Sequence, residues 1–324
     1  MKSNIFSEAT DSSTNDVLDW MYFLAGGKQL ERQNDFVIPE KLTITITDNQ
    51  TNKVKNWYRR GKVIRHTKRQ NTVQNPKMQT AWENIQKVFM VEQRFVEEAF
   101  INLKFPYNES INKPIDNNVN KIYVLKMAEQ SGLRIPDSII SNNIPEIRLF
   151  LENEKEYIIK DVALDPVVFH FEDYIATTIL LPTKLTGKEI IEKIKDYDIN
   201  HNNGFLFVQK YISKVIELRI FYLKGAFYSM AIFSQQNEQT KVDFRNYDRE
   251  KPNRCIPFQL PNEIERKLNN LMKEIKINCG SIDMIYTPEG NYVFLEVNPI
   301  GQFQWLSHSC NYDIEKQIAQ FLIN

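Results

Sequence analysis

The chain has 324 residues, of which 42% are hydrophobic and 25% are charged, so its composition is that of a globular protein large enough for two or three domains. Its 41 basic side chains balance 41 acidic ones, which excludes an overall positive field for nucleic acid or an anionic membrane. Three widely spaced cysteines fit a reducing compartment. No apolar run approaches the roughly 20 residues of a membrane span and no apolar signal core is present, so we expect a cytoplasmic protein. The four histidines are not spaced as metal ligands.

Residues 1–115 are expected to form a first, small α/β domain. Ser13 or Thr14 can cap a helix over residues 16–22, and residues 42–47 alternate with period two, as a strand does. Helical periodicity predicts a helix over residues 81–100. Its apolar side chains are expected in the core: Trp82, Ile85, Phe89, Phe95, Val96 and Phe100. Residues 108–120 are rich in Asn, Pro and Asp and predict a domain boundary.

Residues 116–204 are expected to form a central domain, and residues 205–324 a C-terminal one. In the central domain the pattern predicts helices over residues 123–130 and 187–197, and strands over residues 138–140, 157–160 and 172–181. In the C-terminal domain it predicts strands over residues 205–212, 217–222 and 227–233 and helices over residues 263–275 and 311–322. Lys224-Gly225 is a plausible turn between the second and third of those strands.

The most informative segment is a β-hairpin predicted over residues 279–299. If Glu289 and Gly290 form a two-residue loop, Asp283 falls opposite Glu296, and Asn298 shares their face of the sheet. Facing carboxylates repel unless a cation lies between them, and two acids with an amide oxygen suit Mg²⁺. A solvated hairpin face with scattered acids is the alternative. The opposite face carries an apolar set for the core: Ile282, Met284, Val293, Leu295 and Val297.

Earlier in the chain, cationic and polar residues occur in an order that suits ATP. Lys121 at a helix start and Lys160 at a strand end can neutralise α- and β-phosphates as point charges. Arg219 and Arg245 can contact the γ-phosphate, or the carboxylate being activated, through a bidentate fork. Backbone groups of one strand end can meet an adenine edge beside an apolar slot: Gln209, Lys210, Tyr211 and Ile212.

Each of these residues also has an ordinary explanation. Lys121 can be a surface lysine, Arg245 can be solvated in a polar loop, and Glu217 with Arg219 on one strand face can form a structural ion pair. The order in which the signals occur together, rather than any single residue, carries the prediction of a nucleotide site.

In that order the motifs resemble the ATP-grasp superfamily. Residues 120–136, with Asn-Lys at the start and Gly-Leu-x-Ile-Pro at the end, are similar to the opening of its central domain. Glu217-Leu-Arg219, residues 242–246 and Asp283 with residues 294–299 are similar to its C-terminal half. The resemblance implies an α+β fold with a pre-ATP-grasp N-terminal domain and with ATP between the central and C-terminal sheets. Residues 161–169 depart from it, because they lack the glycines of the phosphate loop that many members have.

Further motifs resemble the graspetide (microviridin-like, grasp-with-spasm) peptide macrocyclases: residues 7–14, 17–20, 57–61, 294–303 and 310–312. This resemblance implies a ligase that forms side-chain esters or amides between Asp or Glu and Thr, Ser or Lys of a ribosomally made precursor peptide, through an acyl phosphate. It implies ATP and Mg²⁺ as cofactors, a leader and core peptide as partner, and a homodimer. The implied metal ligands are Asp283, Glu296 and Asn298, and the implied catalytic residues are Glu217, Arg219 and Arg245.

Two alternatives stay open. An enzyme of the same superfamily can join a free amino acid to a small acid or a protein end. A non-catalytic scaffold can hold nucleotide and bind only the leader peptide.

Overall fold

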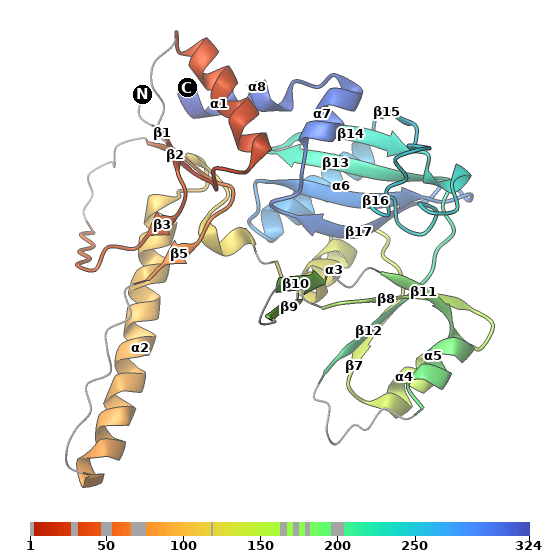
Figure 1. Cartoon of the computed structure of the whole chain (residues 1–324), viewed down its shortest axis with the longest axis horizontal. Coiled ribbons are helices and arrows are strands. Elements are labelled where there is room, and N and C mark those ends of the chain that lie inside the picture. Colours follow the sequence, from red (N-terminus) through yellow and green to blue (C-terminus); the bar gives the residue numbers. More distant parts are fainter. Residues whose placement is uncertain are drawn as a thin grey trace. The chain divides into compact units, whose positions relative to one another are not determined.

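The computed structural model describes residues 3–26, 32–46, 54–65, 76–117, 119–162, 167–170, 175–178, 182–195 and 204–324. The chain forms two compact units (Figure 1). Unit 1 contains Met1–Asn118, Lys276–Cys279 and Pro299–Asn324, and unit 2 contains Val119–Ile275 and Gly280–Asn298. The division into three domains stays a prediction, but the last segment of the chain belongs to unit 1 and does not extend the predicted C-terminal domain.

A parallel sheet forms the centre of unit 1. Its strands, in spatial order, are β2 (Arg32–Gln33), β1 (Ser3–Phe6), β4 (Lys55–Tyr58) and β6 (Ser110–Ile111). A second parallel pair joins β3 (Phe36–Val37) to β5 (Val63–Ile64). Aromatic side chains fill the core between them, where Phe6 lies 5.3 Å from Phe36 and 5.6 Å from Phe105, measured between ring centroids. The strand predicted over residues 42–47 is wrong, because residues 42–46 form no strand and residue 47 lies outside the described residues.

Helices from both ends of the sequence pack together in unit 1. Helix α1 (Ser12–Leu24) lies beside α8 (Ile314–Ile323), which follows α7 (Gln304–Cys310) (Figure 1). A short 3₁₀ turn, η1 (Pro114–Asn117), comes before the start of unit 2. The C-terminal helix therefore completes the unit in which the chain begins.

The predicted long helix is present as α2 (Pro76–Lys104), but most of its apolar side chains do not lie in the core. Ile85, Phe89 and Val96 are 45%, 52% and 45% exposed, and Phe95 is 59% exposed. Only the C-terminal end of α2 meets the core, where Ile101 is 1% exposed. Trp82 and Phe100 are half-buried. Periodicity located the helix correctly, but it does not say what covers its apolar face.

Unit 2 contains a four-stranded antiparallel sheet. Its order is β11 (Thr183–Thr186), β8 (Glu156–Lys160), β12 (Leu206–Lys210) and β7 (Ser138–Ser141). Helices α4 (Ile144–Phe150) and α5 (Gly187–Lys193) close a core around Tyr157, which is fully buried. Another antiparallel pair joins β9 (Val167–His170) to β10 (Ile175–Thr178). The rest of the strand predicted over residues 172–181 lies outside the described residues, apart from β10.

A five-stranded sheet forms the other half of unit 2. Its order is β15 (Cys255–Pro257), β14 (Ala226–Ile232), β13 (Ile216–Leu223), β16 (Cys279–Tyr286) and β17 (Tyr292–Asn298). The predicted turn between β13 and β14 is confirmed: Lys224 and Gly225 have φ values of 48° and 100°, as a tight hairpin requires. Two helices accompany this sheet, α6 (Asn262–Glu274) and α3 (Lys121–Gln130), and α3 contacts both β17 and α6.

The hairpin of β16 and β17 pairs Asp283 with Glu296, as predicted, but by a different path. Thr287 and Asn291 close the turn, with Gly290 at a φ of 81°, so the loop has three residues. A β-bulge beyond Met284, which pairs with Phe294, then leaves Leu295 as the extra residue and restores the acid pair. The predicted core position of Leu295 is wrong, because the bulge turns its side chain into the pocket described below.

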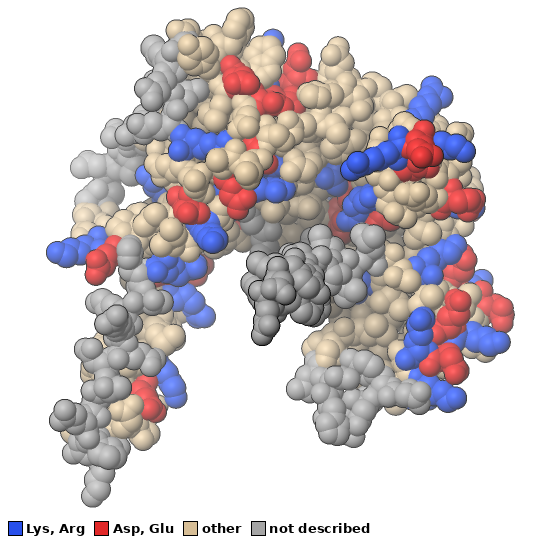
Figure 2. All heavy atoms as spheres, viewed as in Figure 1, with Lys and Arg blue, Asp and Glu red and all other residues tan. Residues whose placement is uncertain are grey.

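Basic and acidic side chains are interspersed on the face shown in Figure 2, so no single-sign field is visible there. Among the described residues, no helix is both long and apolar enough to cross a bilayer.

Candidate active site

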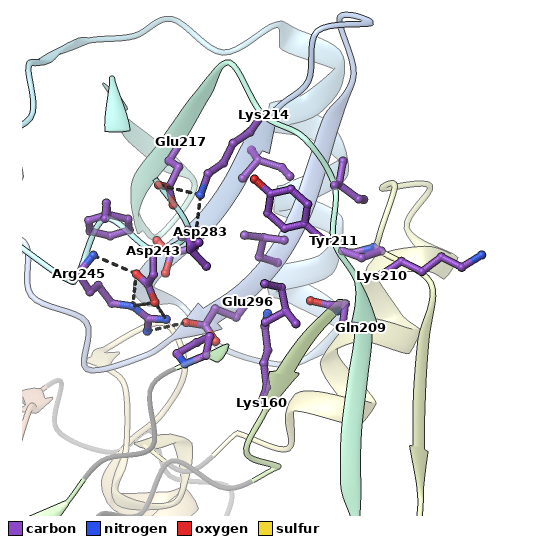
Figure 3. Close-up of a pocket in the computed structure, with 18 residues that line it drawn as sticks. Lys160, Gln209, Lys210, Tyr211, Lys214, Glu217, Asp243, Arg245, Asp283 and Glu296 are labelled. Carbon is purple, nitrogen blue, oxygen red and sulfur yellow. Dashed lines mark hydrogen bonds and ion pairs between the residues drawn. The ribbon is translucent and has the colours of Figure 1, made fainter. Parts of the chain in front are cut away.

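A small pocket of about 80 Å³ lies in unit 2, where the end of the four-stranded sheet meets the five-stranded sheet (Figure 3). Strands β8 and β12 contribute Lys160 and Gln209, and β13, β16 and β17 contribute Glu217, Asp283 and Glu296. Residues 242–245 close one side of the pocket. Most of the residues singled out in the sequence therefore converge in one place.

An arginine neutralises Asp283 from the neighbouring strand. The Nη1 atom of Arg219 donates to both carboxylate oxygens of Asp283 at 2.9 Å. Both side chains are about nine-tenths buried. The structural ion pair considered between Glu217 and Arg219 is thus replaced by a pair that joins β13 to β16. Arg219 lies behind the acid rather than among the residues that line the pocket.

Arg245 holds the other acid of the hairpin. It donates to Asp243 at 2.7 Å and to Glu296 at 3.3 Å. Burial alone would raise the pKa of Asp243, but the hydrogen bonds and charge of Arg245 hold that pKa below its ordinary value. Burial works against the charge on Arg245, yet Asp243 and Glu296 together raise its pKa. Asp243 is a site residue that sequence reasoning missed, although it stands two positions before Arg245.

Two half-buried lysines, one from the start of α3 and one from the end of β8, approach Glu296. Lys160 extends toward Glu296 from the end of β8 (Figure 3), and Lys121 begins α3, where the Asn120 side chain caps the helix. Burial lowers the pKa of each lysine, and the charge of Glu296 partly opposes this effect. Lys121 also donates to the backbone oxygen of Asp161 at 3.3 Å. A polyanion at this point would relieve the cost of burying both ammonium groups.

Lys214 is the second residue missed in the sequence. Its Nζ lies 2.9 Å from the Glu217 carboxylate and donates to the Val242 oxygen at 2.9 Å. Ser234 donates to the same carboxylate at 2.6 Å. Burial raises the pKa of Glu217, and Lys214 opposes that rise. The three-residue spacing between Lys214 and Glu217 was the available signal.

The segment proposed to frame adenine lines the pocket, but its members differ. Gln209 is buried and donates to Ser138 at 3.0 Å. The side chain of Lys210 extends away from the pocket (Figure 3) to Asp137, 3.2 Å distant. The backbone N–H groups of Lys210 and Tyr211 already donate to the backbone oxygens of Asp137 and Glu156, at 2.8 and 2.9 Å. The adenine role of residues 209–212 stays a prediction, carried by the remaining backbone groups and by the walls of Tyr211 and Ile212.

Asn298 is the one predicted metal ligand outside this group. It pairs with Ser281 at the end of β17 and is half-buried. Within the described part of the chain, neither this pocket nor the smaller one beside it, lined by Lys121, Lys160 and Glu296, includes Asn298.

The fold matches solved structures over its whole length. The chain is similar to the macrocyclase MdnC from Microcystis aeruginosa, solved with the precursor peptide MdnA, with 24% identity, a TM-score of 0.68 and full coverage of both chains. It is similar to an ATP-grasp ligase from Chryseobacterium gregarium, solved with ADP and a leader and core peptide, with 22% identity and a TM-score of 0.67 over 99% of this chain and 95% of that one. It is also similar to the ATP-grasp ligase PsnB, solved with a minimal precursor, Mg and ADP, with 16% identity and a TM-score of 0.62 over 99% of this chain and 96% of that one.

These likenesses show that the chain has the α+β fold of the ATP-grasp ligases, as the motifs predicted. The sequence matches no family model and no curated protein.

Proposed function

We propose that this protein is an ATP-dependent ligase that joins Asp or Glu side chains of a ribosomally made precursor peptide to Thr, Ser or Lys side chains of the same peptide, as macrocyclic esters or amides. One observation carries the proposal. The paired acids of the five-stranded sheet and Lys160 of the four-stranded sheet converge on one pocket, in a chain that matches a macrocyclase over its full length. The likeness supports the reaction class, and the residues give it a chemical basis.

ATP fits the donor set of this pocket together with that of the smaller one beside it, which Lys121 and Lys160 line. Lys121 and Lys160 are cations whose burial is unfavourable without an anion, so they suit the phosphates. Ligand pockets ordinarily measure about 300–1,000 Å³, whereas this one measures about 80 Å³. Nucleotide binding therefore requires side chains to move. The mobile candidate is Arg245, which is 42% exposed and bridges to Glu296 at 3.3 Å.

Mg²⁺ fits the facing carboxylates of Asp283 and Glu296, because hard cations prefer oxygen ligands and the two acids now depend on arginines for neutralisation. Asn298 stays the proposed third ligand. When bound, the cation spreads the negative charge of the transferring phosphoryl group.

The residues of the chain then have distinct roles in the reaction. A peptide carboxylate is a poor electrophile, and its phosphorylation by ATP to an acyl phosphate supplies a leaving group that a hydroxyl or amine can displace. Arg245, once released from Glu296, can hold the γ-phosphate or the incoming carboxylate with its planar fork. Arg219 positions Asp283, and Lys214 positions Glu217. The narrow pocket limits water, which would otherwise hydrolyse the mixed anhydride.

The proposed partner is a precursor peptide with a leader and a core. The MdnC and Chryseobacterium proteins were solved with such peptides. A leader that docks on the predicted central domain, residues 116–204, would hold the core peptide near the pocket. The three cysteines are free thiols, and this supports the proposal that the enzyme acts in the reducing cytoplasm.

We further propose that the chain forms a homodimer through α2. Five exposed apolar side chains recur along this helix at successive spacings of seven, four, seven and seven residues, which place them on one face as in a seam between two helices. They are Met78, Ile85, Phe89, Val96 and Leu103, each between 45% and 59% exposed. A second copy of the chain offers the same stripe. Light scattering should show a dimer, and Phe89→Lys should give a monomer, whereas Lys87→Ala, whose position faces away from the stripe, should leave the dimer intact. A monomeric unmodified chain would contradict this proposal.

The function is tested with ATP, Mg²⁺ and a candidate precursor peptide that contains a leader and a core. Macrocyclisation removes one water mass for each link and releases ADP. Glu296→Gln should abolish both results, whereas Glu289→Gln, at the tip of the same hairpin, should preserve them.

Each alternative has its own outcome in this assay. A mass gain of one amino acid residue would identify the free amino acid ligase and reject macrocyclisation. Leader binding without ADP release from the unmodified chain would identify the scaffold.

A further inference from the structure

A second group of potential ligands lies in unit 1, away from the residues assigned to the reaction. Asp16 of α1, His308 of α7 and Glu315 of α8 each present one ligand atom, and these three atoms lie within 4.8 Å of one another. They line a cavity of about 480 Å³, together with Asp19 and Asp313. The histidine spacing gave no hint of this group, because the fold brings together residues from the two ends of the sequence.

Glu315 points to a bound cation independently of that clustering. Its side chain is 95% buried (5% exposed), and its Oε1 atom has no hydrogen-bond partner. The other oxygen, Oε2, accepts from Ser307 at 2.6 Å. In the described part of the chain, none of the acids in this cavity forms an ion pair, and the ammonium group of the adjacent Lys316 lies over the Trp20 ring at 5.1 Å from its centroid. A buried carboxylate without a counter-charge is costly.

Hydrogen bonds hold two of these carboxylates in place and leave oxygen atoms available. Gln304 donates to Asp16 Oδ2, and Ser307 both holds Glu315 and accepts from the backbone of Ile314 at 3.1 Å. Such supporting contacts orient the carboxylate ligands of metal sites. His308 is exposed, so an ion can reach the group from solvent.

We propose that Asp16, His308 and Glu315 bind one divalent transition-metal ion, with Zn²⁺ as its representative. An imidazole nitrogen with two carboxylate oxygens suits such ions, whereas Mg²⁺ and Ca²⁺ prefer oxygen ligands alone. Zinc bonds of about 2.0–2.2 Å require the three ligand atoms to move closer by roughly 1 Å. The bound ion joins α1 to the corner between α7 and α8 and so ties the two ends of the chain together. This proposal does not depend on the proposed ligase activity.

The test is zinc binding by the full-length protein after chelator treatment, measured by calorimetry with ZnCl₂ alone and again in excess Mg²⁺. We expect one tight equivalent of Zn²⁺ that Mg²⁺ does not displace. Glu315→Gln and His308→Ala should each weaken that equivalent by at least about tenfold. Asp19→Asn, in the wall of the same cavity, and Glu296→Gln, in the other acidic group, should preserve it.

Thermal melts without metal verify that each variant folds. Zinc should raise the melting temperature of the unmodified chain but not that of Glu315→Gln. If His308→Ala fails to fold, His308→Gln takes its place. Absence of a tight equivalent, or its survival in both ligand variants, would overturn the proposal. Loss of the equivalent in Glu296→Gln alone would assign the zinc to the other site and would overturn it as well.

Discussion

Replacing Lys214 with Met tests how strongly the floor of the pocket depends on one buried ion pair. The side chains of Lys214 and Glu217 are only 5% and 8% exposed, and their charged atoms lie 2.9 Å apart. Removing the lysine leaves Glu217 with the Ser234 hydroxyl alone. Breaking a buried pair from one side costs about 3–5 kcal/mol, because the remaining charge is uncompensated. We expect Lys214→Met to lower the stability of β13 by that amount at neutral pH.

The pH dependence gives the prediction its sign. Burial raises the pKa of Glu217 and Lys214 opposes that rise, so Lys214→Met should raise it further. A carboxyl whose folded pKa exceeds its unfolded pKa destabilises the fold once the pH exceeds the folded pKa, and the cost disappears as the pH falls to the unfolded pKa. The loss of stability should therefore be complete at pH values above the raised pKa of Glu217 and should vanish as the pH falls to about 4.3, the ordinary pKa of a Glu side chain.

Hydrogen exchange at the amides of β13 measures the local free energy of opening, which suits a chain of two units better than a single unfolding transition does. Lys241→Met is the matched control, because Lys241 and Glu238 have the same spacing at 3.1 Å but are 45% and 88% exposed. Its cost should be below about 1 kcal/mol. Lys214→Met with Glu217→Gln should recover most of the loss. A cost for Lys214→Met that only equals the control would refute this reasoning.

Three further predictions follow from single contacts. Lys160→Met should weaken ADP binding, measured by calorimetry, about 10- to 150-fold, which is the equivalent of one charged hydrogen bond. Lys210→Met should have little effect on ADP binding, because the Lys210 side chain extends to Asp137. Equal losses in the two variants would contradict the assignment of Lys160 to the nucleotide. Burial raises the pKa of Asp116 to about 6, so ionisation of its carboxyl group disfavours the fold above that pH. Asp116→Asn should raise the free energy of unfolding in urea by about 1–2 kcal/mol at pH 8, after allowance for solvent screening, and should leave it unchanged near pH 4. An equal gain in stability at both pH values would exclude ionisation of Asp116 as the cause. Gly187→Ala should lower the free energy of unfolding by at least about 2 kcal/mol in the same assay, because the new Cβ would lie 2.2 Å from the Glu152 backbone oxygen. An unchanged free energy of unfolding would show that the backbone relaxes to accommodate the methyl group.

The sequence predicted best where periodicity and chemistry act locally. The turn at Lys224-Gly225 follows from positive φ, and the structure contains it. The pairing of Asp283 with Glu296 is also present, but alternation alone does not explain it, because the three-residue loop and the bulge at Leu295 offset each other. Motif order predicted the ATP-grasp fold, which the comparisons show. These features depend on neighbouring residues or on a fixed order along the chain.

Features that depend on distant packing were missed. The apolar face of α2 has the spacing of a core helix, but only tertiary structure shows that Phe89 stays exposed. Lys214 belongs to no motif identified in the sequence, yet the fold buries it beside Glu217. The direction of the Lys210 side chain depends on Asp137, which belongs to another segment. No local pattern contains such information.

Because β17 has one extra residue, its pairing register with β16 differs by one position between the two ends of the hairpin. Near the turn, the three-residue loop places Ile285 opposite Val293, and beyond Leu295 the register advances by one position. Without that shift, Leu295 would lie opposite Asp283, and Glu296 would point to the other face of the sheet, into the hydrophobic core. Because the advance exists, the pocket receives both the carboxylate and an isobutyl wall from consecutive positions. Deleting Leu295 would remove this advance and would therefore turn the side chains that follow it, Glu296 among them, to the opposite face of the sheet.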